Sequence, residues 1–262
     1  MDDSEIERYA RHLVLRQVGG AGQARLRGAK VLVVGAGGLG APLLMYLAAA
    51  GVGTIGVVDD DTVALSNLQR QIVHMTRAIG EAKTESAART LAQINPHVHV
   101  VEHRERLGAH NARALVSGYD VVADGCDNFE TRFCINDACY FEKKVLVSGA
   151  LAQFDGQLAT FKAHVARDSG GHYPCYRCLF PAPPPPGSVQ NCAEAGILGA
   201  VAGVIGTLQA TEVLKEILGI GDTLAGKLLI YDALGARMRT VKLKADPACA
   251  LCGDTRTIMD VR

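Results

Sequence analysis

Four of the eight cysteines form two Cys-x-x-Cys pairs, Cys175 with Cys178 and Cys249 with Cys252. Thiolates at this local spacing are the usual ligands of closed tetrahedral zinc sites. Four thiolates leave no open position on the metal, so the pattern favours one structural Zn²⁺ per chain over a catalytic centre. A redox-active pair and unconnected thiols are the alternatives.

A glycine pattern points to nucleotide chemistry. The aliphatic run 31–34 is followed by Gly35, Gly37 and Gly40 in a Gly-x-Gly-x-x-Gly arrangement, and then by a helical pattern. Backbone N–H groups at such a helix N-terminus attract phosphate. Asp59 ends the next aliphatic strand, where a carboxylate can hydrogen-bond ribose hydroxyls. An NAD dehydrogenase fits these residues equally well.

The residues after Asp59 separate the two interpretations. Arg70 and Lys83 follow the acidic strand end, with the Gln71 amide close by. Two cations and an amide suit a triphosphate, although both cations could instead be solvated surface charges. Asp127 follows another predicted strand on the crevice side of the sheet, where it could hold Mg²⁺ on phosphate oxygens or form part of a helix cap.

The other cysteines lack a metal-binding spacing. Cys192 precedes a predicted helix, and a thiol near a helix N-terminus has a lowered pKa. It is therefore either a nucleophile or a small buried residue. Cys126, Cys134 and Cys139 have no partnering pattern and are expected in the core.

Alternating strand and helix patterns must position these groups. Continuous aliphatic runs in the first half predict strands buried on both faces, near residues 31–34, 54–58, 98–101, 118–123 and 144–148. With helices between them, they imply a Rossmann-like, doubly wound parallel sheet of the α/β class. Alternating patterns at 157–162, 228–231 and 238–243 predict that antiparallel strands extend this sheet.

Three further segments carry structural expectations. Ser4 and Glu7 form a capping-box pattern that opens a helix to about Leu13, ahead of a glycine-punctuated loop at 19–22. The proline-rich stretch 181–188 is expected to be a surface loop. Residues 194–218 read as a helix that is buried or at a dimer interface, with small residues allowing close approach of another helix.

Length and composition bound the class of protein. At roughly 150 residues per domain, 262 residues fit one large domain. We divide it into an N-terminal helical arm (1–28), a nucleotide-binding half (29–150), an antiparallel and zinc half (151–253) and a tail (254–262). The formal net charge is zero, so nucleic acid is not an expected partner. No signal peptide or membrane span is evident, which predicts a cytoplasmic protein.

Together these residues resemble the MoeB/ThiF family, the bacterial relatives of ubiquitin-activating enzymes. The resemblance runs from about residue 5 to 253 and is closest to the branch that acts on molybdopterin synthase. Its motifs are Arg8-Tyr-Ala-Arg11-His, Gly-Ala-Gly-Gly-Leu-Gly, Asp59-x-Asp61 through Asn67-Leu-Gln-Arg70-Gln, Lys83, Asp127-Asn, Cys192-x-Glu-Ala-Gly and both Cys-x-x-Cys pairs.

The resemblance implies an activity and a set of site residues. ATP with Mg²⁺ would adenylylate the C-terminal glycine of a ubiquitin-like sulfur carrier that ends in Gly-Gly, preparing it to become a thiocarboxylate. A separate sulfurtransferase or cysteine desulfurase would supply the sulfur. The implied nucleotide-binding residues are Gly37, Gly38, Asp59 (on the ribose), Asp61, Asn67, Arg70 and Lys83, with Asp127 on Mg²⁺ and Arg11 reaching the ATP of the other subunit of a homodimer.

The chemistry agrees with this implication. A C-terminal carboxylate, with a pKa of about 3.5, is already an anionic nucleophile at neutral pH, so no general base is needed. The obstacle is repulsion from the triphosphate, which arginine, lysine and Mg²⁺ can offset. The alternatives are a carrier of the thiamine or cysteine pathway, a zinc-containing NAD oxidoreductase, and an inactive carrier-binding scaffold.

Overall fold

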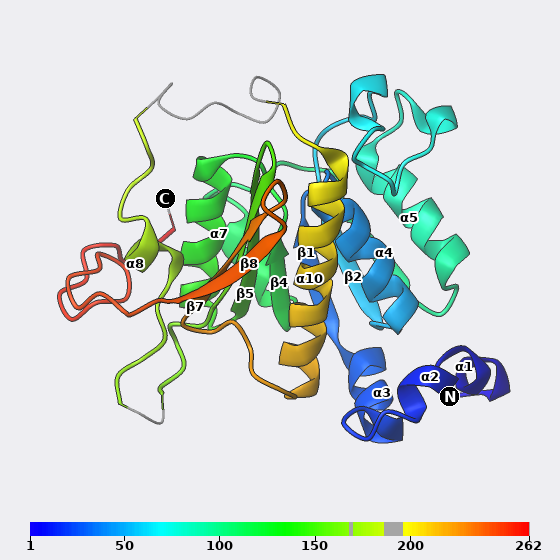
Figure 1. Ribbon diagram of the computed structural model, residues 1–262, viewed down its shortest axis with the longest axis horizontal. Coiled ribbons are helices and arrows are strands. Elements are labelled where there is room, and N and C mark those ends of the chain that lie inside the picture. Colours follow the sequence, from blue (N-terminus) through cyan, green and yellow to red (C-terminus); the bar gives the residue numbers. More distant parts are fainter. Residues whose placement is uncertain (168–169, 186–195, 262) are drawn as a thin grey trace.

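One eight-stranded sheet organises the computed structural model, which describes residues 1–167, 170–185 and 196–261 (Figure 1). The strands are β1 (Lys30–Val34), β2 (Thr54–Val58), β3 (His99–His103), β4 (Val121–Asp124), β5 (Val145–Ala152), β6 (Asp155–Phe161), β7 (Lys227–Asp232) and β8 (Arg237–Lys242). Their order is β3-β2-β1-β4-β5-β6-β7-β8. Neighbours from β3 to β5 pair in parallel, and β6, β7 and β8 are added antiparallel. The predicted fold class is confirmed.

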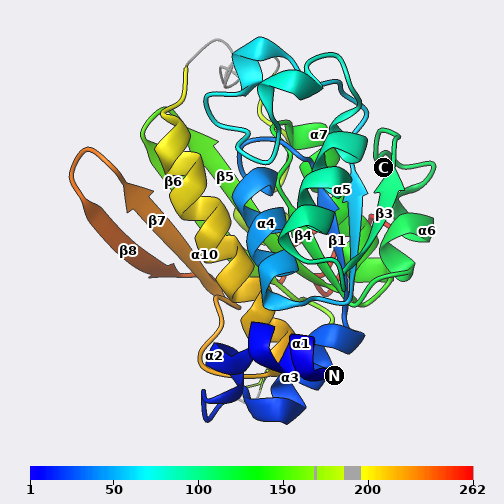
Figure 2. The same cartoon turned by 90° about the vertical axis from the view of Figure 1, so that its right-hand side faces the viewer.

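Helices cover both faces of the parallel strands (Figure 2). They are α1 (Asp3–Arg8), α2 (Ala10–Leu13), α3 (Gly19–Gly28), α4 (Gly40–Ala50), α5 (Lys83–Ile94), α6 (Ala112–Ser117), α7 (Phe129–Phe141), α8 (Tyr176–Leu179) and α10 (Gly199–Leu218), with the 3₁₀ turns η1 (Leu65–Asn67) and η2 (Thr76–Ala78). Side chains of β1 alternate between two apolar clusters, Val31 and Val33 in one, Leu32 and Val34 in the other. Burial on both faces explains the continuous aliphatic runs.

Helix α10 packs closely against α4, as its small residues led us to expect. A Cβ atom on Gly206 would lie 2.5 Å from the Leu39 carbonyl oxygen, whereas one on Gly203 would meet nothing within 4 Å. The predicted helix over 194–218 is wrong at 196–198, while residues 194 and 195 lie outside the described residues. Ile197 forms a bridge with Gln153, and the Leu198 N–H donates to the Gln153 carbonyl, so the helix begins at Gly199.

Two expectations about the N-terminal segment are wrong. The capping box is formed by Asp2 and Glu5, whereas the Ser4 hydroxyl donates to the Asp2 carboxylate. Residues 19–22 are not a loop, because α3 begins at Gly19. A Cβ atom on Gly22 would lie 3.1 Å from a methyl group of Leu218, so this glycine allows α3 to approach the end of α10.

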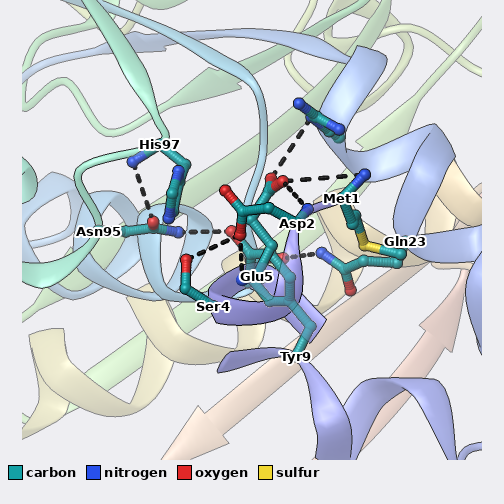
Figure 3. Close-up of polar contacts among 10 residues, drawn as sticks. Met1, Asp2, Ser4, Glu5, Tyr9, Gln23, Asn95 and His97 are labelled. Carbon is teal, nitrogen blue, oxygen red and sulfur yellow. Dashed lines mark hydrogen bonds and ion pairs between the residues drawn. The ribbon is translucent and has the colours of Figure 1, made fainter. Parts of the chain in front are cut away.

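Buried polar contacts fasten the N-terminal helices to the rest of the fold (Figure 3). The Asn95 amide donates to the Tyr9 hydroxyl at 2.8 Å and to the Ala48 carbonyl at 2.7 Å. Gln23 donates to the carbonyl of Ala50 at 2.9 Å. These bonds fix the helical arm at the end of α4 where that helix leads into β2.

The C-terminal half follows the expected pattern in its described parts. Strands β7 and β8 form the predicted hairpin. Residues 181–185 are not in a helix or strand and are mostly exposed, whereas 186–188 lie outside the described residues. No helix in the described part of the chain is long and apolar enough to cross a membrane.

Candidate active site

A cavity of about 850 Å³ opens at the carboxyl ends of β1, β2 and β4. Its volume lies within the range of about 300 to 1,000 Å³ that small-molecule sites occupy. In open parallel sheets this is the edge at which ligands bind. Helices α1, α2 and α3 lie at the opposite end of the sheet in Figure 2. Of the residues predicted from sequence, the cavity is lined by Gly37, Gly38, Asp59, Asp61, Arg70, Lys83 and Asp127.

The glycine loop between β1 and α4 is turned back tightly on itself. Gly35 has a φ of +94°, and a Cβ atom on Gly40 would lie 1.9 Å from the Gly35 carbonyl oxygen. Neither position tolerates a side chain without a backbone shift. A Cβ atom on Gly37 would meet only the Gln71 amide, at 3.8 Å, so this residue faces open space on the cavity wall. The loop can therefore present backbone N–H groups to a phosphate.

Asp59 ties the end of β2 to this loop. One carboxylate oxygen accepts from the Ala36 N–H at 2.8 Å, and the other accepts from the Asp61 N–H at 2.9 Å. Burial raises the pKa of Asp59, while the charge of Lys83 and both hydrogen bonds act to lower it. Each carboxylate oxygen still has lone-pair capacity for a further donor such as a ribose hydroxyl.

Two cations approach the cavity from different segments. Lys83, the first residue of α5, is buried and its ammonium lies 2.7 Å from an Asp61 carboxylate oxygen. Arg70 donates to the Ser66 carbonyl at 3.1 Å, and its side-chain carbons face Gly38. The cavity thus combines positive charge with backbone donors, a combination that suits a phosphate chain.

Asp127 is exposed on the cavity wall, just after a loop that Arg132 holds in place. The Arg132 guanidinium donates to the Cys126 carbonyl at 2.6 Å and lies 3.8 Å from the buried Asp124 carboxylate. Asp124 in turn accepts from the Cys126 N–H at 3.0 Å. Burial acts to lower the pKa of Arg132, but the charges of neighbouring groups, led by Asp124, raise it by more. Sequence reasoning missed Arg132, whose only signal was a cation near Asp127.

Three predicted site residues are not brought to this cavity in one chain. Asn67 is not on the cavity wall, and its side-chain oxygen accepts from the Ala64 N–H at 3.3 Å. Arg11 is exposed on α2, at the opposite end of the sheet (Figure 2). Cys192 lies outside the described residues. Of these, Arg11 could reach an ATP site only from a second subunit.

The four paired cysteines converge on one point. Their sulfur atoms lie within 4.8 Å of one another, with separations such as 3.4 Å for Cys175 to Cys252 and 3.6 Å for Cys175 to Cys249. Zinc–sulfur bonds of about 2.3 Å in a tetrahedron require sulfur separations of about 3.8 Å. The residues therefore fit a structural Zn²⁺. Figure 1 shows α8, which follows Cys175, beside the C-terminal segment in red.

Helix α7 supports this cluster through two consecutive residues that sequence reasoning missed. The fully buried Asp137 accepts two hydrogen bonds of 2.7 Å from Arg177, which lies between the first two cysteines. Asn136 accepts from the Tyr176 N–H at 2.7 Å. Such contacts around a metal cluster orient its ligands.

The remaining described cysteines divide between core and cavity. Cys134 and Cys139 are buried, as expected. Burial raises the pKa of Cys134 to about 12, so its thiol is neutral at physiological pH. Cys126 is half-buried: it packs against the core cluster that contains Leu32 and Val34 but also lines the cavity, so the core prediction holds only in part for this residue.

Comparisons with known proteins agree with this geometry. The profile described as the ThiF family matches residues 9–251. The chain is 51% identical over 253 residues to a sulfur carrier protein adenylyltransferase of Thermus thermophilus, covering 97% of this chain and 93% of the relative. It is 47% identical to the SAMP-activating enzyme E1 of Haloferax volcanii, covering 97% and 91%.

The chain is also similar to part of a longer relative and to a solved structure. The chain is 47% identical to the adenylyltransferase and sulfurtransferase MOCS3 of Anopheles gambiae, covering 98% of this chain but 57% of that protein. The crystal structure of Escherichia coli MccB with MccA-N7isoASN matches with a TM-score of 0.79 at 22% identity, covering 94% of this chain and 75% of the other. That structure shares the fold.

Proposed function

We propose, from the premise that this chain belongs to the ThiF family, that it is an ATP-dependent adenylyltransferase of a ubiquitin-like sulfur carrier protein. The carrier's C-terminal glycine carboxylate attacks the α-phosphorus of ATP. An acyl adenylate forms and pyrophosphate leaves. The names of the Thermus and Haloferax relatives support this class of substrate.

One observation carries the proposal: the glycine loop, Arg70, Lys83 and Asp127 come from separate segments and meet on one cavity. Attack by a carboxylate on a triphosphate brings like charges together, so the reaction needs fixed cations more than it needs a base. The cavity supplies two such cations and a loop of backbone donors. An NAD site would not require both cations.

We assign the following roles. Gly37 and Gly38 line the nucleotide, and Asp59 accepts from the ribose. Arg70 and Lys83 neutralise the phosphates. Asp127 is the residue that would hold Mg²⁺, which supplies further charge neutralisation when bound.

The carrier is proposed to be of the molybdopterin synthase small-subunit type, with a C-terminal Gly-Gly. Carriers of the thiamine or cysteine pathways are the alternatives. The protein is proposed to act as a homodimer in which Arg11 of one subunit serves the other subunit's ATP. Cys192 is assigned no part in adenylylation, and a sulfurtransferase or cysteine desulfurase partner is proposed to deliver the sulfur afterwards.

Exchange of labelled pyrophosphate into ATP tests the proposal, because exchange requires reversible formation of the adenylate. We expect exchange with a carrier that ends in Gly-Gly and none with the same carrier shortened by one glycine. NAD binding without carrier-dependent exchange would favour the oxidoreductase alternative and refute the proposal.

A further inference from the structure

A buried histidine lies directly beneath the glycine loop. His74 is 4% exposed. Its Nε2 lies 2.9 Å from the Ala36 carbonyl oxygen, and its Nδ1 lies 2.9 Å from the Ser86 hydroxyl. None of the roles assigned above uses this side chain. It nevertheless connects the loop to helix α5, whose first residue is Lys83.

These two partners fix the tautomer of the ring. A carbonyl oxygen can only accept, so Nε2 carries the proton and donates it to Ala36. In the neutral ring Nδ1 then accepts from the Ser86 hydroxyl. Burial lowers the pKa of His74, and the nearby charge of Lys83 lowers it further, which agrees with a neutral ring.

The bond to Ala36 controls where the next N–H group points. The Ala36 carbonyl and the Gly37 N–H belong to one trans peptide, in which the two groups point in opposite directions. Because the Ala36 carbonyl points toward the buried His74 ring, the Gly37 N–H points away from the core. Gly37 lines the cavity, so this N–H is directed to the cavity side of the loop. The Ala36 N–H, on the other side of this residue, donates to the Asp59 carboxylate.

We propose that His74 is a positioning residue that aims the Gly37 N–H at a phosphate of the bound nucleotide. Ser86 sets the tautomer from the same helical turn that carries Lys83, so one turn of α5 arranges both the lysine and the loop donor. The identity of the nucleotide as ATP rests on the proposed function.

Substitution of His74 by glutamine or by asparagine separates its bond to the Ala36 carbonyl from its bond to the Ser86 hydroxyl. A glutamine amide at position 74 can reach the place of Nε2 and still donate to Ala36. An asparagine amide reaches only the place of Nδ1. His74→Asn should therefore lose the bond to the loop while His74→Gln keeps it. Thr90→Val is the matched control, because Thr90 donates to the Val73 carbonyl at 2.7 Å and fastens the same segment to α5 without touching the loop.

The readout is the dissociation constant of a non-hydrolysable ATP analogue with Mg²⁺, measured by calorimetry without carrier. We expect His74→Asn to weaken binding about tenfold, the size of one or two net hydrogen bonds, and both His74→Gln and Thr90→Val to stay within about twofold. Ser86→Ala, which keeps the ring, should weaken binding about threefold.

Equal weakening by His74→Asn and Thr90→Val would show a merely structural role and overturn the proposal. The proposal would also be overturned if His74→Asn bound the ATP analogue as tightly as wild type, or if His74→Gln bound it as weakly as His74→Asn. If His74→Asn does not fold, the test rests on Ser86→Ala, and a dissociation constant of this variant equal to that of wild type would overturn the proposal. Because no carrier is present, a wild-type protein that binds ATP but never adenylylates a carrier would refute the proposed function and leave this inference standing.

Discussion

The Lys83 ammonium lies 2.7 Å from an Asp61 carboxylate oxygen, and the pair joins a buried cation to an exposed anion. The lysine side chain is 6% exposed, and that of the aspartate is 68% exposed. The cation is thus fixed by packing while its partner stands in solvent at the cavity. A phosphate that enters the cavity can compete with Asp61 for an ammonium that is already in place.

Lys83 also acts on the titration of Asp59. Burial raises the pKa of Asp59 above 3.8, and Lys83 opposes that shift because it stabilises the carboxylate. Lys83→Met keeps an apolar stem of similar length and removes the charge, so we expect the pKa of Asp59 to rise further. Carbon-13 NMR of the Asp59 carboxyl measures this directly, with Lys30→Met, an exposed residue at the opposite end of β1, as the control.

The raised pKa of Asp59 predicts that nucleotide binding depends on pH. A raised pKa means that Asp59 becomes protonated at a higher pH than an ordinary aspartate, and the neutral acid accepts the Ala36 N–H less well. Affinity for ATP should fall as the pH drops through the pKa of Asp59. An Asp59 carboxyl that titrates at or below 3.8 in the wild-type protein would contradict both statements.

Asp127→Ala should abolish adenylylation without harming the fold. The side chain is exposed, so its removal costs no packing, whereas loss of a metal ligand should reduce pyrophosphate exchange by about 100-fold or more. Glu130→Ala is the matched control, since this exposed acid stands three residues further along and does not line the cavity. Near-normal exchange by a folded Asp127→Ala protein would refute the assignment.

One zinc ion should be bound per chain. Cys249→Ser should lose the metal and lower the melting temperature, because binding energy at a structural zinc site stabilises the fold. Cys139→Ser, at a buried cysteine outside the cluster, should keep a full equivalent of zinc. Elemental analysis of freshly purified protein checks both, and zinc-free wild-type protein would contradict the prediction.

Arg11 should act across a dimer. Arg11→Ala and Asp127→Ala proteins should each be inactive, yet mixing them should restore activity. Random exchange makes about half the dimers mixed, each with one intact site of two, so activity should return to about a quarter of wild type. Subunit exchange without recovery would show that Arg11 does not act in trans.

Local sequence patterns predicted the sheet well because parallel strands are buried on both faces and must be aliphatic. They failed where tertiary contacts decide the local structure. Gly22 looks like a loop residue but serves helix packing against Leu218. The start of α10 depends on the pairing of Ile197 with Gln153, a contact that no local pattern reveals.

In the candidate active site too, sequence position predicted some residues, whereas others depend on tertiary contacts. Asp59 directly follows β2 and Lys83 is the first residue of α5, and at such strand ends and helix starts position alone predicts proximity. His74 and Arg132 act on the backbone of loops far away in the sequence or across a turn, so only the folded chain reveals their partners. Asp137 meets Arg177 across 40 residues for the same reason.

Intact mass spectrometry of the carrier shows whether this protein transfers AMP to it. Wild-type protein is incubated with ATP, Mg²⁺ and candidate carriers that end in Gly-Gly, in the absence of any sulfur donor. We expect a carrier to gain the mass of one AMP, and the same carrier without its last glycine to gain nothing. A carrier set that stays unmodified while the protein binds ATP, or AMP on the shortened carrier, would contradict this expectation.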